Sequence, residues 1–267
     1  SLITVGYSAN ALGGAGGPLA VLIIAIVAAE LGKAVSKETK VDILVTPLVT
    51  IFAGVGLSML IAAPIGAAAS QVGTLIMWAT EQAPLVMGIL VSVIVGVALT
   101  LPISSAAICA ALGLTGLAGG AAVAGCCAQM VGFAVMSYRE NGVGGLVSQG
   151  LGTSMLQMGN IIKNPRIWIA PTLASAITGP LATCLFHFEM NGAAVSSGMG
   201  TCGLVGQIGV YTGWVSDIAA GTKAAITPMD WAAMVLLCFV LPAVLSVVFC
   251  EVERKLGWIK DGDLKLD

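Results

Sequence analysis

Long apolar stretches separated by short charged loops are the feature that most limits what this chain can fold into. A helix that crosses a bilayer needs about 20 mostly apolar residues. Mean hydropathy is +1.02 and only 9% of the residues are charged, against about 25% in soluble domains. We therefore predict an all-α polytopic transmembrane bundle, a single integral membrane domain over residues 1–267. The apolar stretches that approach or reach the length of a span are Pro18–Leu31, Ile43–Ala63, Pro84–Leu101, Leu117–Met136, Ile167–Phe186 and Trp231–Cys250.

Three further segments have intermediate polarity, and the sequence leaves their structure open. Interfacial helices, re-entrant hairpins and cavity-lining spans are all compatible with Pro64–Gln82, Gly142–Ile162 and Phe188–Ile226. Lysine and arginine mark residues 33–42, residues 163–166 and the C-terminal tail, so the positive-inside rule places these on the cytoplasmic side. Residues 188–230 then begin and end on the outer half of the membrane, as a re-entrant hairpin with a short connection would.

Composition and motifs argue against several classes of function. The formal net charge is −2 and no basic face is visible, which excludes a nucleic-acid partner. The seven cysteines show no CxxC spacing and no metal-ligand spacing with the lone histidine, so we expect small buried hydrophobic residues rather than a metal site. A phosphate loop and a nucleophile elbow are also absent. The chain is therefore expected to be neither an enzyme nor a cofactor-binding protein.

Two glycine- and alanine-rich stretches resemble each other. Residues 66–74 read GAAASQVGT and residues 192–201 read GAAVSSGMGT. Each follows, by about twenty residues, a proline that opens an apolar span. This predicts two structural repeats, 43–115 and 167–240, an arrangement in which transporters often bind their substrate between the halves. The alternative is that two stretches of similar composition match by chance.

The only histidine, His187, lies two residues before Glu189 in an otherwise apolar part of the chain. Ionisable residues at membrane depth usually serve function, because their burial in lipid is costly. On one helix, residues i and i+2 point to different faces, so these two meet only if the chain bends, and Asn191-Gly192 is a bend signal. We predict that His187, Glu189 and Asn191 line a solvated cavity. Otherwise His187 caps or packs an interface, and Glu189 pairs with a nearby cation.

A sugar-like solute needs uncharged donors and acceptors beside such a carboxylate. The second stretch, extended to Gln207, supplies hydroxyl and amide groups, and the first, extended to Glu81, offers a matching set that ends in a glutamate. Glu81 follows Trp78 and is otherwise an interfacial anchor. Asp217 is expected on a membrane-surface segment, where it could pair with Lys223. The further candidate substrate-binding residues are Ser196, Ser197, Thr201, Gln207, Ser70, Gln71 and Glu81.

The NPRIWIAPT run at 164–172 and the HFEMNGAAVSSGMGTCGLVGQ segment at 187–207 give the chain a family resemblance. It resembles the enzyme IIC-like membrane proteins of the phosphotransferase system, in the branch that includes the PfoR-type regulatory proteins. The resemblance implies a homodimeric sugar channel in the bacterial inner membrane, with a polar Glu and His site near re-entrant hairpins. By it, His187, Glu189 and Asn191 contact the substrate. We expect no fused phosphotransfer domain, so any phosphate donor is expected to be a separate protein.

Two functions remain open at this point. The first is an EIIC-like permease for a small polar solute such as a sugar. The second is a PfoR-type membrane sensor that binds a ligand without transporting it. The expected partners are a small-molecule solute or a lipid, the membrane itself, a second copy of the chain, and a soluble cytoplasmic protein. A channel or lipid-handling protein is a weaker third alternative.

Overall fold

The computed structural model describes residues 17–36 and 42–266, and over these residues the chain is helical without any strand. Their one β contact is an isolated antiparallel bridge between Gly116 and Met190. This confirms the all-α prediction. The chain forms two compact units, the first made of residues 1–73 with 110–112 and the second of residues 74–109 with 113–267.

Four helices in the described part of the chain are long and apolar enough to cross a membrane. One belongs to the first unit and three to the second, and the shorter apolar helix α4 (Pro84–Thr100) adds to them. Each overlaps a stretch expected from hydropathy, which confirms a multi-pass membrane protein. The four are Leu44–Ile65, Gly116–Met136, Pro165–Leu185 and Pro228–Lys255.

The first unit consists mainly of two helices. Helix α2 spans Gly17–Val35, and α3 begins at Asp42 and continues to Gln82 with two internal prolines. Ala20 and Ile24 of α2 pack on Ala62 of α3 in a small apolar cluster. The first glycine-rich stretch, residues 66–74, lies inside α3, whereas its counterpart at 192–201 is mostly 3-10 helix and turn. The internal repeat and the re-entrant hairpins stay predictions.

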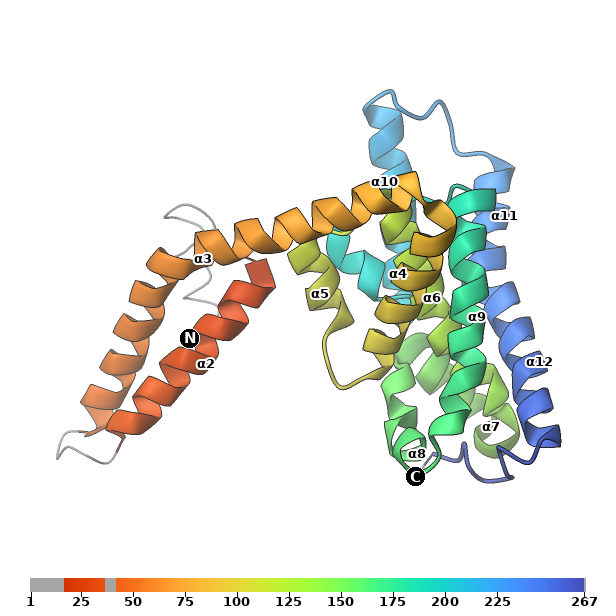
Figure 1. The fold of residues 1–267 in the computed structure, drawn as a ribbon, viewed down its shortest axis with the longest axis horizontal. Helices are drawn as coiled ribbons and strands as arrows, with labels where there is room; N and C mark the ends of the chain where they lie inside the picture. Colours follow the sequence, from red (N-terminus) through yellow and green to blue (C-terminus); the bar gives the residue numbers. More distant parts are fainter. Residues whose placement is uncertain (1–16, 37–41, 267) are drawn as a thin grey trace. The chain divides into compact units, whose positions relative to one another are not determined.

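Helix α6 (Gly116–Met136) is the centre of the second unit, and α4, α9 and α12 pack around it (Figure 1). Nearly every residue of α6 is buried, and small residues allow its close contacts. A Cβ on Gly125 would overlap the backbone of Ser92 in α4. Helix α9 (Ile169–Pro180) lies between a 3-10 turn, Pro165–Trp168, and a π turn, Leu181–Leu185.

Prolines mark where the apolar helices of the second unit begin. Pro84, Pro165 and Pro228 each occupy a first helical position, where the missing N–H costs nothing. Asn164 precedes Pro165 and accepts a hydrogen bond from the Arg166 backbone N–H. Thr227 precedes Pro228 and forms a capping box with Asp230. The last span then runs through α11 (Pro228–Val235), a π turn (Leu236–Val240) and α12 (Leu241–Lys255).

Buried polar side chains join the helices of this bundle. The Ser92 hydroxyl donates to the Ser175 carbonyl of α9 at 2.8 Å. The Trp168 indole N–H donates to Gln129 Oε1 of α6 at 2.9 Å. Hydrogen bonds of this kind favour helix association where water is excluded. Through these contacts Gln129 serves to hold neighbouring helices together.

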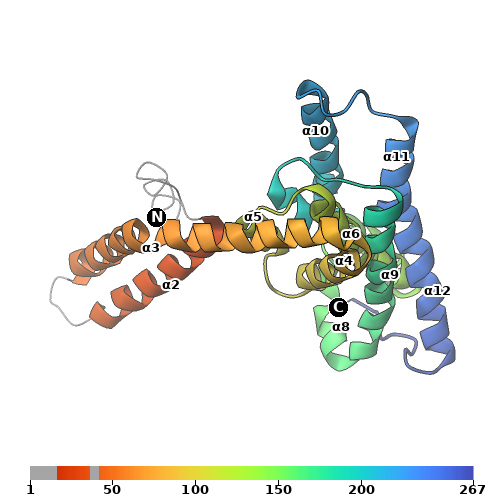
Figure 2. The same cartoon turned by 45° about the horizontal axis from the view of Figure 1, so that its top comes forward.

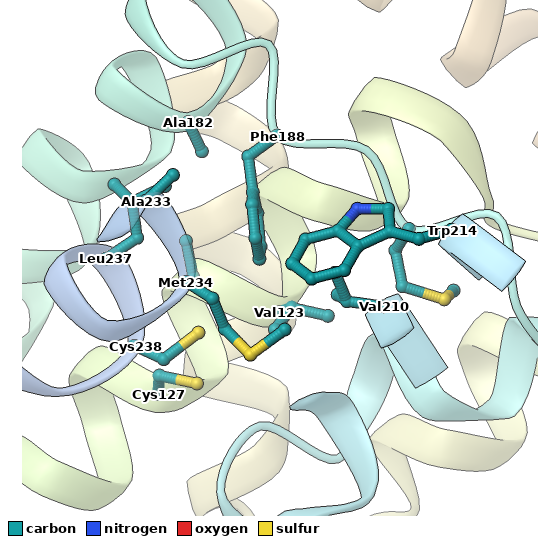
Figure 3. Packing of buried hydrophobic residues seen from close by; sticks show 12 residues of the cluster. Val123, Cys127, Ala182, Phe188, Val210, Trp214, Ala233, Met234, Leu237 and Cys238 are labelled. Atoms are coloured by element: carbon teal, nitrogen blue, oxygen red, sulfur yellow. The ribbon is translucent and has the colours of Figure 1, made fainter. Parts of the chain in front are cut away.

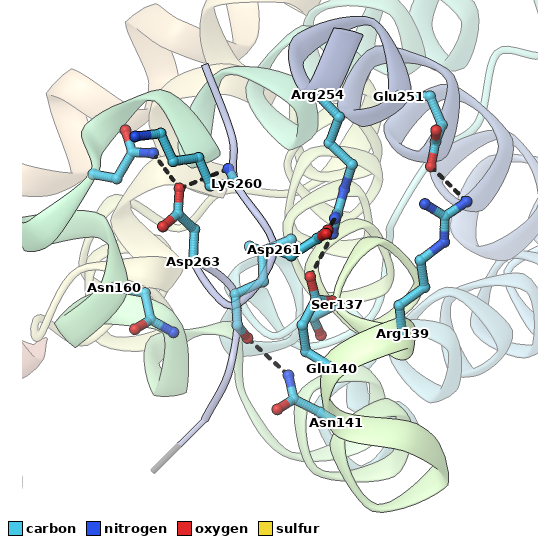
Figure 4. A network of polar contacts seen from close by, with 12 residues as sticks. Ser137, Arg139, Glu140, Asn141, Asn160, Glu251, Arg254, Lys260, Asp261 and Asp263 are labelled. Atoms are coloured by element: carbon cyan, nitrogen blue, oxygen red, sulfur yellow. Dashed lines mark hydrogen bonds and ion pairs between the residues drawn. The ribbon is translucent and has the colours of Figure 1, made fainter. Parts of the chain in front are cut away.

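A charged network closes one end of the second unit (Figure 4). Arg254 of α12 pairs with Glu140 of α7 (Tyr138–Val147) at 2.6 Å, and both side chains are about nine-tenths buried. Arg254 also pairs with Asp261 of the C-terminal tail at 2.9 Å. Asn164 donates to Asp263 at 2.8 Å. The 163–166 loop and the tail, which charge alone assigned to one side of the membrane, therefore lie together.

The remaining helices in the described part of the chain are short, apart from α10. Helix α10 leads from the segment after α9 toward the loop before α11, at the end away from α8 and the tail (Figure 1 and Figure 2). The bounds of these elements are α5 Ser105–Leu112, α8 Met158–Lys163, α10 Val205–Ala219, the π turn Ser148–Gly152 and the 3-10 turns Ser154–Gln157, Ala194–Gly198 and Cys202–Leu204.

The described cysteines are all free thiols. Five of them are buried, as expected for small hydrophobic residues. Cys184 is exposed and Cys202 is partly exposed, so the prediction of buried cysteines fails at these two positions.

Candidate functional site

A pocket of about 500 Å³ lies at one end of two of the spans in the second unit. Phe186 follows directly on the span Pro165–Leu185, and Asp230 lies in the first turn of Pro228–Lys255. The other ends of both spans reach the charged network around Arg254. A helix of 21 residues is about 30 Å long, so the pocket and the network lie on opposite sides of the bundle. The pocket is lined by Phe186, His187, Phe188, Glu189, Asn191, Trp214, Asp217, Thr222, Lys223, Met229, Asp230 and Ala233.

The segment from His187 to Asn191 brings the three predicted polar residues to one wall. It is not helical, and His187 turns the chain with a positive φ of 43°, in the left-handed region that few non-glycine residues adopt. His187, Glu189 and Asn191 line the pocket together with Phe188, whose side chain is only 3% exposed, and Met190 is fully buried. Main-chain hydrogen bonds of 3.0 Å in both directions pair Met190 with Gly116. The departure from helix thus places i and i+2 side chains together.

Glycines on two helices allow this non-helical segment to lie so close to the bundle. A Cβ on Gly120 of α6 would overlap the Phe188 carbonyl. A Cβ on Gly213 of α10 would come within 2.8 Å of the Asn191 backbone nitrogen. Contacts this short do not occur in real side chains, so the wall of the pocket depends on both glycines.

Asn191 connects two carboxylates across the pocket. Its side-chain amide donates to Glu189 Oε2 at 3.0 Å and to Asp217 Oδ2 of α10 at 2.9 Å. Both amide hydrogens are therefore used. One oxygen of each carboxylate accepts from Asn191, and the second oxygen of each retains its acceptor capacity.

Among the residues that the structure describes, Lys223 supplies the one cation of the pocket lining. Its ammonium group pairs with Asp230 Oδ1 at 2.8 Å, so the expected pairing with Asp217 is replaced by this one. The Asp217 main-chain carbonyl instead accepts from the Thr222 hydroxyl at 2.9 Å. The Lys223 ammonium also lies 5.7 Å from the centre of the Trp214 ring, within cation–π range.

The floor of the pocket is apolar and continues into the buried core (Figure 3). Phe188, Trp214 and Ala233 belong both to the pocket lining and to this core. Trp214 packs edge-on against Trp231, with ring centres 5.5 Å apart. Below them lie Val123, Ala124, Cys127, Ala182, Met190, Val210, Met234, Leu237 and Cys238.

The four other candidates from the second stretch are buried and lie outside the pocket lining. The Ser197 hydroxyl donates to the Leu114 carbonyl at 2.6 Å, and the Thr201 hydroxyl donates to the Gly150 carbonyl at 2.5 Å. The Gln207 amide donates to Cys127 Sγ at 3.2 Å. Ser196 packs against Gly209 of α10. These contacts position the segment after the pocket wall, and a direct role in binding stays a prediction.

The candidates from the first stretch lie on α3. Gln71 and Glu81 are exposed, and neither belongs to the pocket lining. The side chain of Ser70 is outside the described residues. Their part in binding also stays a prediction.

Sequence reasoning missed the second half of the pocket. Asp217, Lys223 and Asp230 all line it, together with Trp214. A signal was present, because these ionisable residues flank a loop between apolar helices. That loop must return to the membrane face at which the span before His187 ends. Assigning Asp217 to a surface segment overlooked this shared face.

Comparison with protein families places these observations in context. The family described as phosphotransferase system, EIIC, matches residues 2–266 of the chain. Comparison with curated proteins and with solved structures gave no match.

Proposed function

This chain belongs to the phosphotransferase-system EIIC family, whose members are membrane transport components, and we propose that its pocket binds a small polar solute such as a sugar for passage across the cell membrane. The observation that carries the proposal is the wall formed by Glu189, Asn191 and Asp217 over an aromatic floor. Small-molecule sites typically have volumes of about 300–1,000 Å³ and combine apolar walls with a few convergent polar groups. The pocket, at about 500 Å³, falls within this range.

The chemistry of the wall suits a polyol. Carboxylate oxygens accept hydrogen bonds from hydroxyl groups, and an aromatic ring such as Trp214 offers a flat apolar surface to the C–H face of a sugar. Glu189 and Asp217 approach from different elements, so hydroxyls on two sides of one ring can be bound together. The three residues His187, Glu189 and Asn191 are those to which the family resemblance pointed.

The position of the pocket indicates from which side of the membrane the solute binds. With the 163–166 loop and the tail on the cytoplasmic side, the pocket opens on the outer side. Its floor is closed by buried residues such as Leu237 and Cys238. We infer that the conformation described accepts solute from outside, and that passage requires the helices of the floor to separate.

Uptake into proteoliposomes tests the proposal. Glu189→Gln keeps the shape of the side chain and removes its charge. We therefore expect solute binding to weaken about tenfold, because one charge-assisted hydrogen bond is lost. Glu30→Gln is a matched control on the exposed face of α2, where the side chain only approaches Lys33 at 3.8 Å. Normal uptake by the Glu189 variant, or an equal loss in both variants, contradicts the proposal.

The closed floor also supports the second candidate, a PfoR-type sensor that binds solute without transporting it. The two candidates share the pocket and differ in flux. Solute binding that depends on Glu189, together with no uptake above that of empty liposomes, favours the sensor. A homodimer and a soluble cytoplasmic partner are further parts of the proposal, and cross-linking in native membranes tests the dimer.

A further inference from the structure

We infer that the pocket selects solutes that carry a positive charge, with amine-bearing sugars as the class that fits, over neutral sugars and sugar acids. This inference rests on the proposed function, because it concerns the solute of the same site. Three observations carry it: the balance of charge in the lining, the unused acceptors of two carboxylates, and an ammonium group of the chain that already occupies part of the site.

The lining is acidic. It contains the carboxylates of Glu189, Asp217 and Asp230 against the single ammonium of Lys223. That ammonium is committed to Asp230 at 2.8 Å. Glu189 and Asp217 consequently have no cation partner among the described residues, and only the neutral Asn191 amide stands between them. Two carboxylates in this arrangement repel each other, and a bound cation relieves the repulsion.

The unused acceptors match an ammonium group. Asn191 donates to one oxygen of Glu189 and one of Asp217, which exhausts its two hydrogens. The two carboxylates lie within hydrogen-bond distance of the same nitrogen, so a second donor can also contact both. An ammonium group has three donor hydrogens and a full positive charge, whereas a hydroxyl group has one donor hydrogen and no charge. Hydrogen bonds between two charged groups are the stronger class.

Lys223 shows that this pocket accommodates an ammonium. Its nitrogen lies over Trp214 at 5.7 Å from the ring centre while it pairs with a carboxylate. Phe186 and His187, on the segment that carries Glu189, also line the pocket. A carboxylate on the solute would instead face the two acids of the pocket, and the ammonium group in the pocket lining is already paired.

A panel of matched monosaccharides tests the inference on the purified full-length protein. For the gluco, galacto and manno configurations, the amino sugar, the neutral hexose and the uronic acid are compared by binding titration at one pH. We expect at least one amino sugar to bind about tenfold more tightly than its matched hexose, and the uronic acids to bind most weakly. Asp217→Asn should reduce the preference for the amine to about twofold or less, while Asp217→Glu, which keeps the charge, should retain it. Glu30→Gln is the surface control, and melting temperatures confirm that the variants are folded.

The outcomes separate this inference from the proposed function. Equal binding of hexose and amino sugar, or tighter binding of a uronic acid, overturns the charge preference while solute binding itself stands. Retention of the preference in folded Asp217→Asn and Glu189→Gln also overturns it. If no sugar of the three classes binds, both the charge preference and the proposed sugar site are rejected.

Discussion

The side-chain amide of Asn191 lies 2.9 Å from Asp217, a residue 26 positions later in the chain. Asn191 lies on the non-helical segment after one membrane span, and Asp217 lies on α10, which leads toward the next. This one contact therefore joins the two halves of the pocket wall. The neutral amide also separates Glu189 from Asp217, which would otherwise face each other without a donor between them.

Replacing this amide should damage the pocket in a graded way. Asn191→Ala removes both hydrogen bonds and leaves two carboxylates facing each other, so we expect solute binding to weaken about tenfold, or roughly 1.4 kcal/mol. Asn191→Asp places a third acid between them and should weaken binding of a neutral sugar further. Binding titrations with the two variants and the parent protein measure this order. A weaker effect from aspartate than from alanine would contradict it.

The glycine contacts predict that alanine destabilises a helical position at which replacing glycine by alanine would ordinarily stabilise the protein. Gly213→Ala brings a methyl group within 2.8 Å of the Asn191 backbone, which must move. An alanine in a helix otherwise stabilises by about 1 kcal/mol relative to glycine. Gly159→Ala is the matched control, because nothing lies within 4 Å of its added Cβ in α8. We expect a lower melting temperature and lost solute binding for Gly213→Ala, and an unchanged or raised melting temperature for Gly159→Ala. Unimpaired binding by Gly213→Ala would remove the argument for close packing of the wall.

The aromatic floor is expected to contribute more to solute binding than an apolar side chain without a ring would. Trp214→Leu keeps an apolar side chain and removes the ring that faces Lys223 and the pocket. Aromatic and cation–π contacts of this type contribute about 0.5–2 kcal/mol, so solute binding should fall by about three- to thirty-fold. Trp258→Leu, at the opposite end of the bundle beside Arg166, serves as the control and should bind solute normally. Titration by isothermal calorimetry distinguishes the two, and equal binding by both variants would count against Trp214.

The charged network at the other end predicts a difference between a buried and an exposed ion pair. Arg254→Ala leaves Glu140 about nine-tenths buried without its cation, which should lower the free energy of unfolding by about 3 kcal/mol. Arg139 also pairs with a glutamate of α12, at 2.9 Å, but its side chain is 67% exposed. Arg139→Ala should therefore cost less than about 1 kcal/mol. Denaturant titrations in detergent compare the two. Similar losses would show that burial of the Arg254 pair is not what stabilises it.

Half of the pocket could be identified from the sequence because its residues are chemically unusual where they occur. A lone histidine and a glutamate next to a bend signal stand out in an apolar chain, and His187, Glu189 and Asn191 do line one wall. Asp217, Lys223 and Asp230 were visible as charges, but their partners were not. Which of the two acids Lys223 pairs with depends on how the loop before α11 folds. Ser197 and Thr201 show the converse, because their hydroxyls bond to distant carbonyls that no local pattern identifies.

The amino-acid sequence was enough to assign the class of the protein, since long continuous apolar stretches in a chain with 9% charged residues satisfy their backbone hydrogen bonds in a membrane as helices. It also placed the start of α4 at Pro84, because a proline at a first helical position acts within one turn. The geometry of the pocket depends on tertiary contacts. The non-helical run from His187 to Asn191 is held by a bridge to Gly116 and by close approach to α6 and α10. Contacts of that kind join residues far apart in the chain, so their geometry follows from packing and not from local preference.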